Sequence, residues 1–178
     1  MRHTARTAAS SATTALGDGR VFPPRAPLFP VDAGRGQARS APRACRVLVV
    51  EDEGLVALEV ETLLTGAGHV VVGTAADRVG ALALARVERP ELALVDVRLS
   101  GAERGLDLAA DLSALGVPVL FVTGNCPLER GRAVAVGCLH KPFDERQLLD
   151  AVAVADRLAR GGPASAERLP SGLHLYRA

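Results

Sequence analysis

Short apolar runs alternate with amphipathic segments through the middle of this 178-residue chain, and this alternation restricts its possible folds more than any other feature. Strands are expected where the apolar runs are short, at residues 46–50, 69–73, 92–96, 117–122 and 137–140. Helices are expected after them, at residues 54–66, 78–88, 104–115, 127–136 and 144–159. Strands that alternate with helices form a parallel sheet covered on both faces, and right-handed crossovers leave few arrangements. We therefore expect an α/β fold of five βα units, a doubly wound parallel sheet with the strand order 2-1-3-4-5.

The carboxyl ends of four predicted strands carry residues that can bind or react. These residues are Glu51, Asp52, Asp96, Thr123 and Lys141. Ligands in open α/β sheets bind at this edge, at the point where the strand order reverses. In the expected order the first and third strands are neighbours, so Asp52 and Asp96 lie next to each other. The sequence therefore predicts one small polar site at the carboxyl edge of the sheet.

The acidic residues of this edge suit a magnesium ion. Carboxylates that are forced together repel each other unless a cation joins them, and Mg²⁺ takes one or two protein carboxylates together with several waters. Asp52 and Asp96 are the candidate direct ligands, and Glu51 is expected to act through water. Glu53 is expected to begin the following helix, where an acidic residue complements the helix dipole.

A carboxylate beside such an ion can act as a nucleophile toward a phosphoryl group and form an aspartyl phosphate. The charge that develops on the phosphoryl oxygens needs donors, and the Thr123 hydroxyl and Lys141 ammonium can supply them. The alternative is that Asp96 only starts a loop, and that Lys141 forms a structural ion pair with Asp52. We prefer the chemical interpretation because all four residues fall at one predicted edge.

Lys141 is the only lysine among the 21 basic residues of the chain. A compact ammonium is not equivalent to a planar guanidinium. The single lysine therefore supports a specific role for an ammonium group at this position.

Four motifs of the chain resemble those of the two-component response-regulator receiver domain. They are Val49-Val-Glu-Asp-Glu53, Leu94-Val-Asp-Val-Arg-Leu99, Phe121-Val-Thr-Gly124 and Lys141-Pro-Phe143, and the match covers about 46–160. The resemblance implies a flavodoxin-like fold, a bound Mg²⁺, and phosphorylation by a histidine kinase or a histidine phosphotransfer protein.

The resemblance also implies a role for each residue of the site. Asp96 is the phosphoacceptor, Asp52 is a metal ligand, and Glu51 is the residue that supports Asp52. The backbone carbonyl of Arg98 is a third metal ligand. Thr123 and Lys141 hold the phosphoryl oxygens, and the peptide bond before Pro142 is usually cis in the family.

The chain departs from the family pattern between the fourth and fifth strands. The step from Thr123 to Lys141 is 141 − 123 = 18 residues, which requires a short or displaced fourth helix. We expect Asn125 to cap this helix, with Pro127 in its first turn. Cys138 stands where many receivers carry an aromatic switch residue. The segment Phe121-Val-Thr-Gly-Asn125 resembles a proteobacterial subgroup of single-domain receivers with Phe-Ala-Thr-Gly-Tyr-like fourth strands, in which a tyrosine stands in place of Asn125.

Three segments are expected: a disordered extension over 1–44, a receiver domain over 45–160 and a flexible tail over 161–178. The Arg-rich extension also resembles an organelle transit peptide, but a flexible extension or an overlong assigned start is the preferred interpretation. Residues 46–160 carry twelve basic and seventeen acidic residues, a balance of −5 that argues against a nucleic-acid partner. No apolar run is long enough to span a membrane.

The cysteines are odd in number and lack the spacing of metal ligands. We expect Cys45, Cys126 and Cys138 to be reduced thiols in a cytoplasmic protein. A redox role for Cys126 or Cys138 is the less favoured alternative, because nothing beyond the thiol itself supports it.

The predicted function is that of a stand-alone receiver that accepts phosphate on Asp96 and signals or relays it through protein contacts. It is not expected to be an enzyme in its own right. The first alternative is a pseudo-receiver that binds a partner without phosphorylation, which Cys138 and the short fourth helix favour. An aspartyl-phosphate hydrolase is disfavoured because position 98 is Arg98 and not a second acid.

Overall fold

Six strands form one sheet in the order β2-β1-β3-β4-β5-β6 in the computed structural model, which describes residues 43–99, 104–163 and 169–176. Their bounds are β1 Arg46–Val50, β2 Val70–Ala75, β3 Leu92–Val95, β4 Val119–Thr123, β5 Gly137–His140 and β6 Leu173–Leu175. The first five strands are parallel, and β6 runs antiparallel to β5. The predicted α/β fold with the order 2-1-3-4-5 is confirmed, and β6 extends it at one edge.

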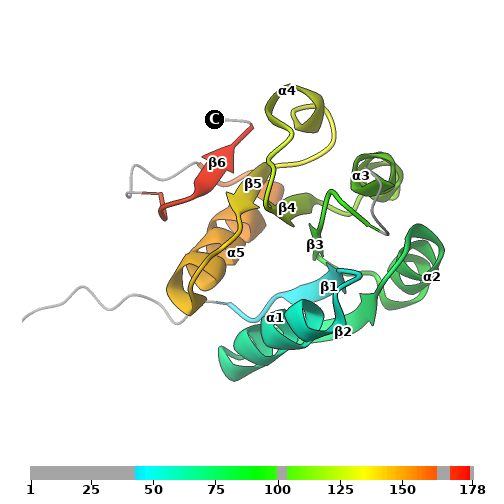
Figure 1. Ribbon diagram of the computed structural model, residues 1–178, viewed down its shortest axis with the longest axis horizontal. Helices are drawn as coiled ribbons and strands as arrows, with labels where there is room; N and C mark the ends of the chain where they lie inside the picture. Colours follow the sequence, from blue (N-terminus) through cyan, green and yellow to red (C-terminus); the bar gives the residue numbers. More distant parts are fainter. Residues whose placement is uncertain (1–42, 100–103, 164–168, 177–178) are drawn as a thin grey trace, which may run out of the picture. The chain divides into compact units, whose positions relative to one another are not determined.

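The helices cover both faces of this sheet (Figure 1). Their bounds are α1 Gly54–Gly66, α2 Arg78–Glu88, α3 Arg104–Ala114, α4 Leu128–Gly131 and α5 Glu145–Ala159. Helices α1 and α5 pack on one face around Leu64, Leu94 and Leu148. Helices α2 and α3 pack on the other face around Ala81, Leu108 and Phe121. Every residue of β3 and β4 is buried, as expected for central strands that are covered on both sides.

Two helices begin at aspartate caps that are visible in the sequence. The Asp77 side chain accepts a hydrogen bond of 2.7 Å from the backbone N–H of Gly80 and starts α2. Asp144 and Gln147 exchange side-chain and backbone hydrogen bonds of 2.8 Å in a capping box that starts α5. These caps fix the point at which the chain turns back from the carboxyl edge of the sheet.

Helix α4 is much shorter than the predicted helix over 127–136. It has four residues, its N-cap is Pro127, and no side chain caps it. The predicted cap at Asn125 is wrong, because the backbone N–H of Asn125 instead points to the Thr123 hydroxyl oxygen. The helix cannot continue to residue 136, because the backbone N–H of Val136 donates a hydrogen bond of 2.8 Å to the carbonyl of Val119. This bond starts the pairing of β4 with β5. The expectation of a short fourth helix is therefore confirmed.

The prediction of a flexible tail over 161–178 is wrong for the end of the chain. Residues Leu173–Leu175 form β6, in which Leu173 pairs with Leu139 on β5. Leu173 is buried against the α5 side of the sheet, and Tyr176 is buried on the opposite side. The predicted extension 1–44, except for Arg43 and Ala44, and the tail residues 164–168 and 177–178 lie outside the described residues.

Tyr176 fastens this strand to the domain. Tyr176 is only 7% exposed, and its hydroxyl has no hydrogen-bond partner among the described residues. The ring lies over Gly131 at the end of α4, where an added Cβ would be 2.6 Å from a ring carbon. The absence of a side chain at Gly131 thus makes the space that the aromatic ring occupies.

Candidate functional site

The predicted strand-end residues lie at one edge of the sheet, although to different depths. Glu51 follows β1, Asp96 follows β3, and Thr123 ends β4; their exposed fractions are 6%, 8% and 1%. Lys141 follows β5 and its side chain is 19% exposed. One cation and two carboxylates are therefore largely buried together at this edge of the sheet.

Lys141 joins two of the carboxylates. Its Nζ atom donates to Oε2 of Glu51 at 2.5 Å and to Oδ2 of Asp96 at 2.8 Å. Its backbone N–H donates to the carbonyl of Thr123 at 2.9 Å, which continues the pairing of β4 with β5. The peptide bond between Lys141 and Pro142 is cis, as the resemblance implied. The ion pairs of Lys141 that define the site are those with Glu51 and Asp96.

Asp96 is fixed at both carboxylate oxygens. Its Oδ1 atom accepts a hydrogen bond of 3.0 Å from the backbone N–H of Arg98, while Oδ2 faces Lys141. Its own backbone N–H donates to the carbonyl of Val50 at 2.9 Å, which ties it to the adjacent strand. Gly105 lies against this turn so closely that an added Cβ would be 2.1 Å from the Asp96 carbonyl oxygen. Helix α3 can therefore begin beside Asp96 only because position 105 lacks a side chain.

The surroundings of Asp96 keep it ionised. Burial alone would raise its pKa, but the Arg98 N–H, the Lys141 ammonium and the Thr123 hydroxyl together hold the pKa below its ordinary value. A buried carboxylate that stays negative is suited to act as a nucleophile or as a metal ligand.

The pKa values of Glu51 and Lys141, the two neighbours of Asp96, are instead raised. Burial raises the pKa of Glu51 by more than the hydrogen bond from Lys141 lowers it. Burial would lower the pKa of Lys141, but its hydrogen bonds to Asp96 and Glu51 outweigh this effect and raise the pKa. Lys141 therefore carries its positive charge throughout the neutral range.

The donor set fits a magnesium ion that keeps several waters. Among the described residues no three His, Cys, Asp or Glu side chains are grouped as a metal cluster. Mg²⁺ needs fewer, because one or two carboxylates and waters are sufficient. Two carboxylates against one ammonium leave a net negative charge beside Asp96, and the half-buried Asp52 follows the same strand as Glu51. The predicted set of Glu51, Asp52, Asp96 and the Arg98 carbonyl therefore offers the hard oxygen ligands that this cation prefers.

The structure contains one covalent feature near the site that the sequence interpretation did not predict. Cys126 and Cys138 form a disulfide bond, and Cys45 is a free, buried cysteine. The prediction of reduced thiols is therefore wrong for Cys126 and Cys138. No local signal in the sequence indicated this pairing, because Cys126 follows the end of β4 whereas Cys138 lies near the start of β5, and these positions belong to opposite ends of two parallel strands.

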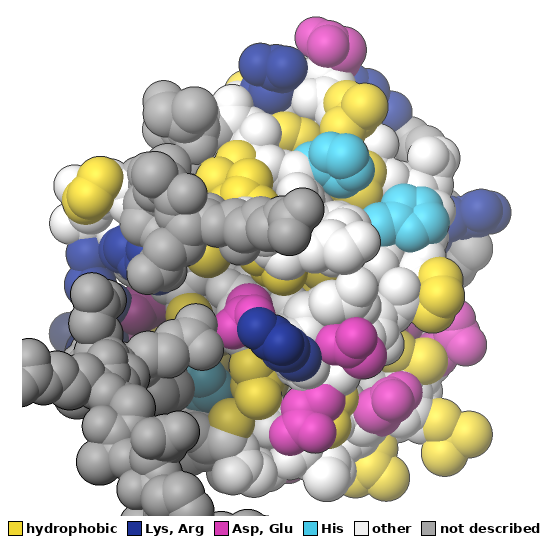
Figure 2. Space-filling view, turned by 90° about the vertical axis from the view of Figure 1, so that its left-hand side faces the viewer, with side chains coloured by type: hydrophobic (Ala, Val, Ile, Leu, Met, Phe, Trp, Pro, Cys, Tyr) yellow, Lys and Arg dark blue, Asp and Glu magenta, His cyan; other side chains and the backbone are white. Residues whose placement is uncertain are grey.

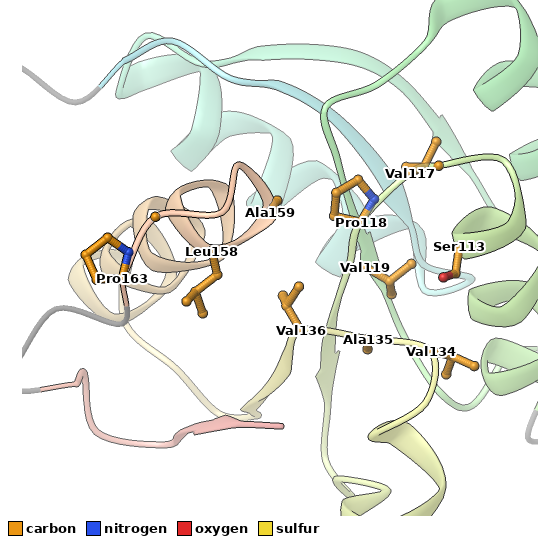
Figure 3. Close-up of a pocket in the computed structure, with 12 residues that line it drawn as sticks. Ser113, Val117, Pro118, Val119, Val134, Ala135, Val136, Leu158, Ala159 and Pro163 are labelled. Atoms are coloured by element: carbon orange, nitrogen blue, oxygen red, sulfur yellow. The ribbon is translucent and has the colours of Figure 1, made fainter. Parts of the chain in front are cut away.

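A pocket of about 470 Å³ lies at the other edge of the sheet. Figure 3 shows it between the start of β4 and β5 and the ends of α3 and α5, with Pro118, Val136 and Leu158 among its walls. Its lining residues are Ser, Gly, Val, Pro, Ala and Leu, which have no ionisable side chain. The pocket therefore takes no part in the chemistry of the acidic site.

Within residues 43–99, 104–163 and 169–176, no helix has the length and apolar character needed to span a bilayer. Figure 2 shows acidic side chains gathered around one basic side chain on the face that it draws.

Comparison with known proteins agrees with this geometry. The family model of the response regulator receiver domain matches residues 47–153, which is more than half of the chain. The receiver domain of a modulated diguanylate cyclase from Desulfovibrio desulfuricans G20 has a TM-score of 0.61 at 32% identity, over 66% of this chain and 98% of that one. The receiver domain of PhyR from Erythrobacter litoralis has a TM-score of 0.54 at 31% identity, over 70% of this chain and 96% of that one.

Two curated relatives match the same region. The phyllosphere-induced regulator PhyR of Methylorubrum extorquens is 40% identical over 90 residues, which are 49% of this chain and 34% of that protein. The transcriptional regulatory protein PdtaR of Mycobacterium tuberculosis is 32% identical over 115 residues, or 62% of this chain and 56% of that protein. The chain thus spans about a third of one relative and just over half of the other. With its sheet order, its acidic edge and its motif set, the chain belongs to the response regulator receiver domain family.

Proposed function

We propose that this protein accepts a phosphoryl group on Asp96 from a histidine kinase or a histidine phosphotransfer protein. The observation that carries the proposal is the buried Asp96 carboxylate, which stays ionised between the Arg98 N–H and the Lys141 ammonium. The modified protein would then signal or relay phosphate through contacts with other proteins.

The position of Asp96 suits it to nucleophilic attack. One carboxylate oxygen forms a bond to phosphorus while the bond between phosphorus and the donor nitrogen or oxygen breaks, and the leaving group keeps that electron pair. The Arg98 N–H fixes Oδ1 and so orients the carboxylate. The neighbouring side chains hold the pKa of Asp96 low, so no base is needed to ionise it.

Lys141 and Thr123 suit the charge that accumulates on the phosphoryl oxygens. The ammonium already lies 2.8 Å from Asp96, and the Thr123 hydroxyl hydrogen-bonds to the same carboxylate. Donors that are in place before the reaction need little reorganisation when charge develops. Glu51 accepts a second hydrogen bond from the same ammonium at 2.5 Å and helps to keep it at the site.

Asp52, Asp96 and the backbone carbonyl of Arg98 would hold a Mg²⁺ ion, with Glu51 acting through water. When bound, the ion would supply positive charge that offsets the repulsion between the carboxylates and the incoming phosphoryl group. The chain's own contribution is to keep these oxygen atoms together at the ends of β1 and β3, which are paired strands.

The partners we propose are proteins: a phosphodonor and a downstream signalling partner. PhyR of Bartonella quintana is described as an anti-anti-sigma factor, and PdtaR as a transcriptional regulatory protein, which places related receivers in the control of transcription. We propose a cytoplasmic location for this chain, because its phosphodonors work there, and no direct contact with nucleic acid or membrane. It is a phosphoacceptor and not an enzyme acting on separate substrates.

A second candidate function is a binding module that works without phosphorylation. Two observations favour it: α4 has four residues, and Cys138 is buried in a disulfide where many receivers carry an aromatic switch residue. Equal binding of one partner by the wild type and by Asp96→Asn would support this function.

The deciding experiment is incubation of the purified protein with Mg²⁺ and acetyl phosphate, followed by measurement of intact mass. The wild type is expected to gain one phosphate and Asp96→Asn none. Asp107→Asn is the matched control, since Asp107 is exposed on α3 and lies outside the site. If neither acetyl phosphate nor a phosphorylated kinase domain modifies the wild type, the proposed function is wrong.

A further inference from the structure

The disulfide joins the loop that follows β4 to the interior of β5. Cys126 lies in that loop, and Cys138 is the β5 residue that pairs with Phe121 on β4. The Cα atoms of the two cysteines are 5.9 Å apart, and the cysteines are 12 positions apart in the sequence. The loop after β4 therefore folds back along the neighbouring strand and is held there by a covalent bond.

In the sequence, both cysteines lie between Thr123 and Lys141, the two residues proposed to hold the phosphoryl oxygens. Cys126 comes three residues after Thr123 (126 − 123 = 3), and Cys138 comes three residues before Lys141 (141 − 138 = 3). The ring that the bond closes contains all of α4, Leu128–Gly131. Opening or closing the bond consequently changes the freedom of the segment that begins at the Thr123 hydroxyl.

The two cysteines differ in exposure. Cys138 is fully buried, whereas Cys126 is only partly buried, in the loop. We therefore expect an external thiol to attack the disulfide at Cys126, because exposure makes a disulfide more exchangeable. Cys45 is a built-in reference, because it is buried beside β1 and burial raises the pKa of its thiol to about 12.

We propose that Cys126 and Cys138 form a reversible thiol–disulfide switch that clamps residues 124–134 and thereby sets how fast Asp96 accepts a phosphoryl group. The effect on rate rests on the proposed function, whereas the clamp itself does not. A disulfide that is exchangeable beside a signalling site would make the receiver respond to the redox state of its surroundings as well as to its kinase.

The oxidising step is exchange with a small-molecule disulfide. The Cys126 thiolate attacks one sulfur of the reagent and releases the other as a thiolate, which leaves a mixed disulfide. The Cys138 thiolate then attacks the Cys126 sulfur, forms the internal bond and releases the second reagent thiolate. Two electrons pass from the cysteine pair to the reagent, and the two cysteine protons pass to its two thiolates. Reduction is the reverse, with the first attack at the Cys126 sulfur.

The structure also gives the direction of the effect on rate. With the bond formed, Thr123 is 1% exposed and its hydroxyl is directed at Asp96. Reduction frees the loop next to this donor, so the donor is no longer held in place before the reaction. We expect the disulfide form to be phosphorylated roughly fivefold faster than the dithiol form, a ratio at the lower end of common coupling between sites.

The first arm of the test measures the switch alone. The folded protein is equilibrated with mixtures of glutathione and glutathione disulfide and quenched with acid. Free thiols are then alkylated with iodoacetamide in denaturing urea, and the alkylated residues are located by mass spectrometry. Cys126 and Cys138 are expected to change together as the ratio changes, and Cys45 is expected to stay constant. A pair that remains thiol in excess glutathione disulfide, or remains bonded in excess dithiothreitol while the protein is folded, overturns the proposal.

The second arm compares phosphorylation of the oxidised and reduced proteins by phosphoramidate, which is indifferent to the thiols. Cys126→Ser is expected to react at the rate of the reduced wild type under both conditions, and Cys45→Ala is expected to retain the redox response. Both variants leave the buried Cys138 in place, so the result does not depend on a substitution inside the core. Equal rates for oxidised and reduced wild type overturn the effect on Asp96.

Amide hydrogen exchange separates the two ways in which the test can fail. Residues 124–134 are expected to exchange at least several-fold more slowly in the oxidised protein, with no change in α1 or α2. If neither form is phosphorylated, the proposed function fails, and the exchange result alone decides the clamp. Equal exchange of this segment in both forms overturns the clamp, whatever the phosphorylation result.

Discussion

The titration of Tyr176 gives a direct test of the strand β6 that was not predicted. Burial raises the pKa of Tyr176 from its ordinary 10.0 to about 12, with a small opposing effect of Arg132. Two pKa units correspond to about 2.7 kcal/mol of free energy. Because the folded pKa is the higher one, this contribution to stability is fully present below pH 10 and is lost as the pH rises through about 12.

The assay is simple because the chain has one tyrosine and no tryptophan. The near-ultraviolet absorbance of tyrosinate is followed during a base titration, while circular dichroism records that the protein is still folded. We expect a midpoint close to 12 in the folded protein, and a midpoint close to 10 in denaturing urea. Tyr176→Phe should show no tyrosinate signal and should lose less stability than the wild type between these two pH values.

The Phe variant also tests the unpaired hydroxyl. Since no described residue bonds to this hydroxyl, its removal should leave the protein at neutral pH as stable or up to about 2 kcal/mol more stable. A titration midpoint near 10 in protein with native circular dichroism would refute the reasoning, because the ring would then be in water and β6 would not be docked on β5.

Three further results are expected from urea unfolding curves. Lys141→Met should lower the free energy of unfolding by about 3 kcal/mol, because it leaves two buried carboxylates without their cation; an unchanged midpoint would contradict the ion-pair geometry. Reduction of the disulfide should lower it by about 3 kcal/mol, since the bond closes a short loop; the Cys126→Ser variant should then be insensitive to reductant. Gly105→Ala should destabilise by about 2 kcal/mol or more, because its Cβ would overlap the Asp96 carbonyl, whereas Gly66→Ala has open space and should change little; equal effects of the two substitutions would show that α3 is not packed closely against Asp96.

The fold could be predicted because its signals are local. Each parallel strand is a short apolar run, and each is followed by a helix with apolar residues at helical spacing. The edge at which Asp96 and Lys141 meet follows from topology alone, since parallel strands all end on the same side. Even the short fourth helix could be predicted by counting residues from Thr123 to Lys141.

The features that could not be predicted depend on contacts between distant segments. Strand β6 has three residues, too few to show a period, and it forms only because β5 offers an open edge. The contact between Glu51 and Lys141 depends on which side chains turn inward after β1. The disulfide depends on the path of the loop that carries Cys126, which no local pattern specifies.

The ammonium held between Glu51 and Asp96 makes the protein its own spectroscopic probe. Because 20 of the 21 basic residues are arginine, Lys141 is the single lysine of the chain. Expression with lysine labelled with ¹³C at its ε carbon would therefore place one labelled side chain at the site, without any substitution in the sequence and with the ammonium group intact. Binding of a cation or modification of Asp96 could then be followed as the shift of one carbon resonance.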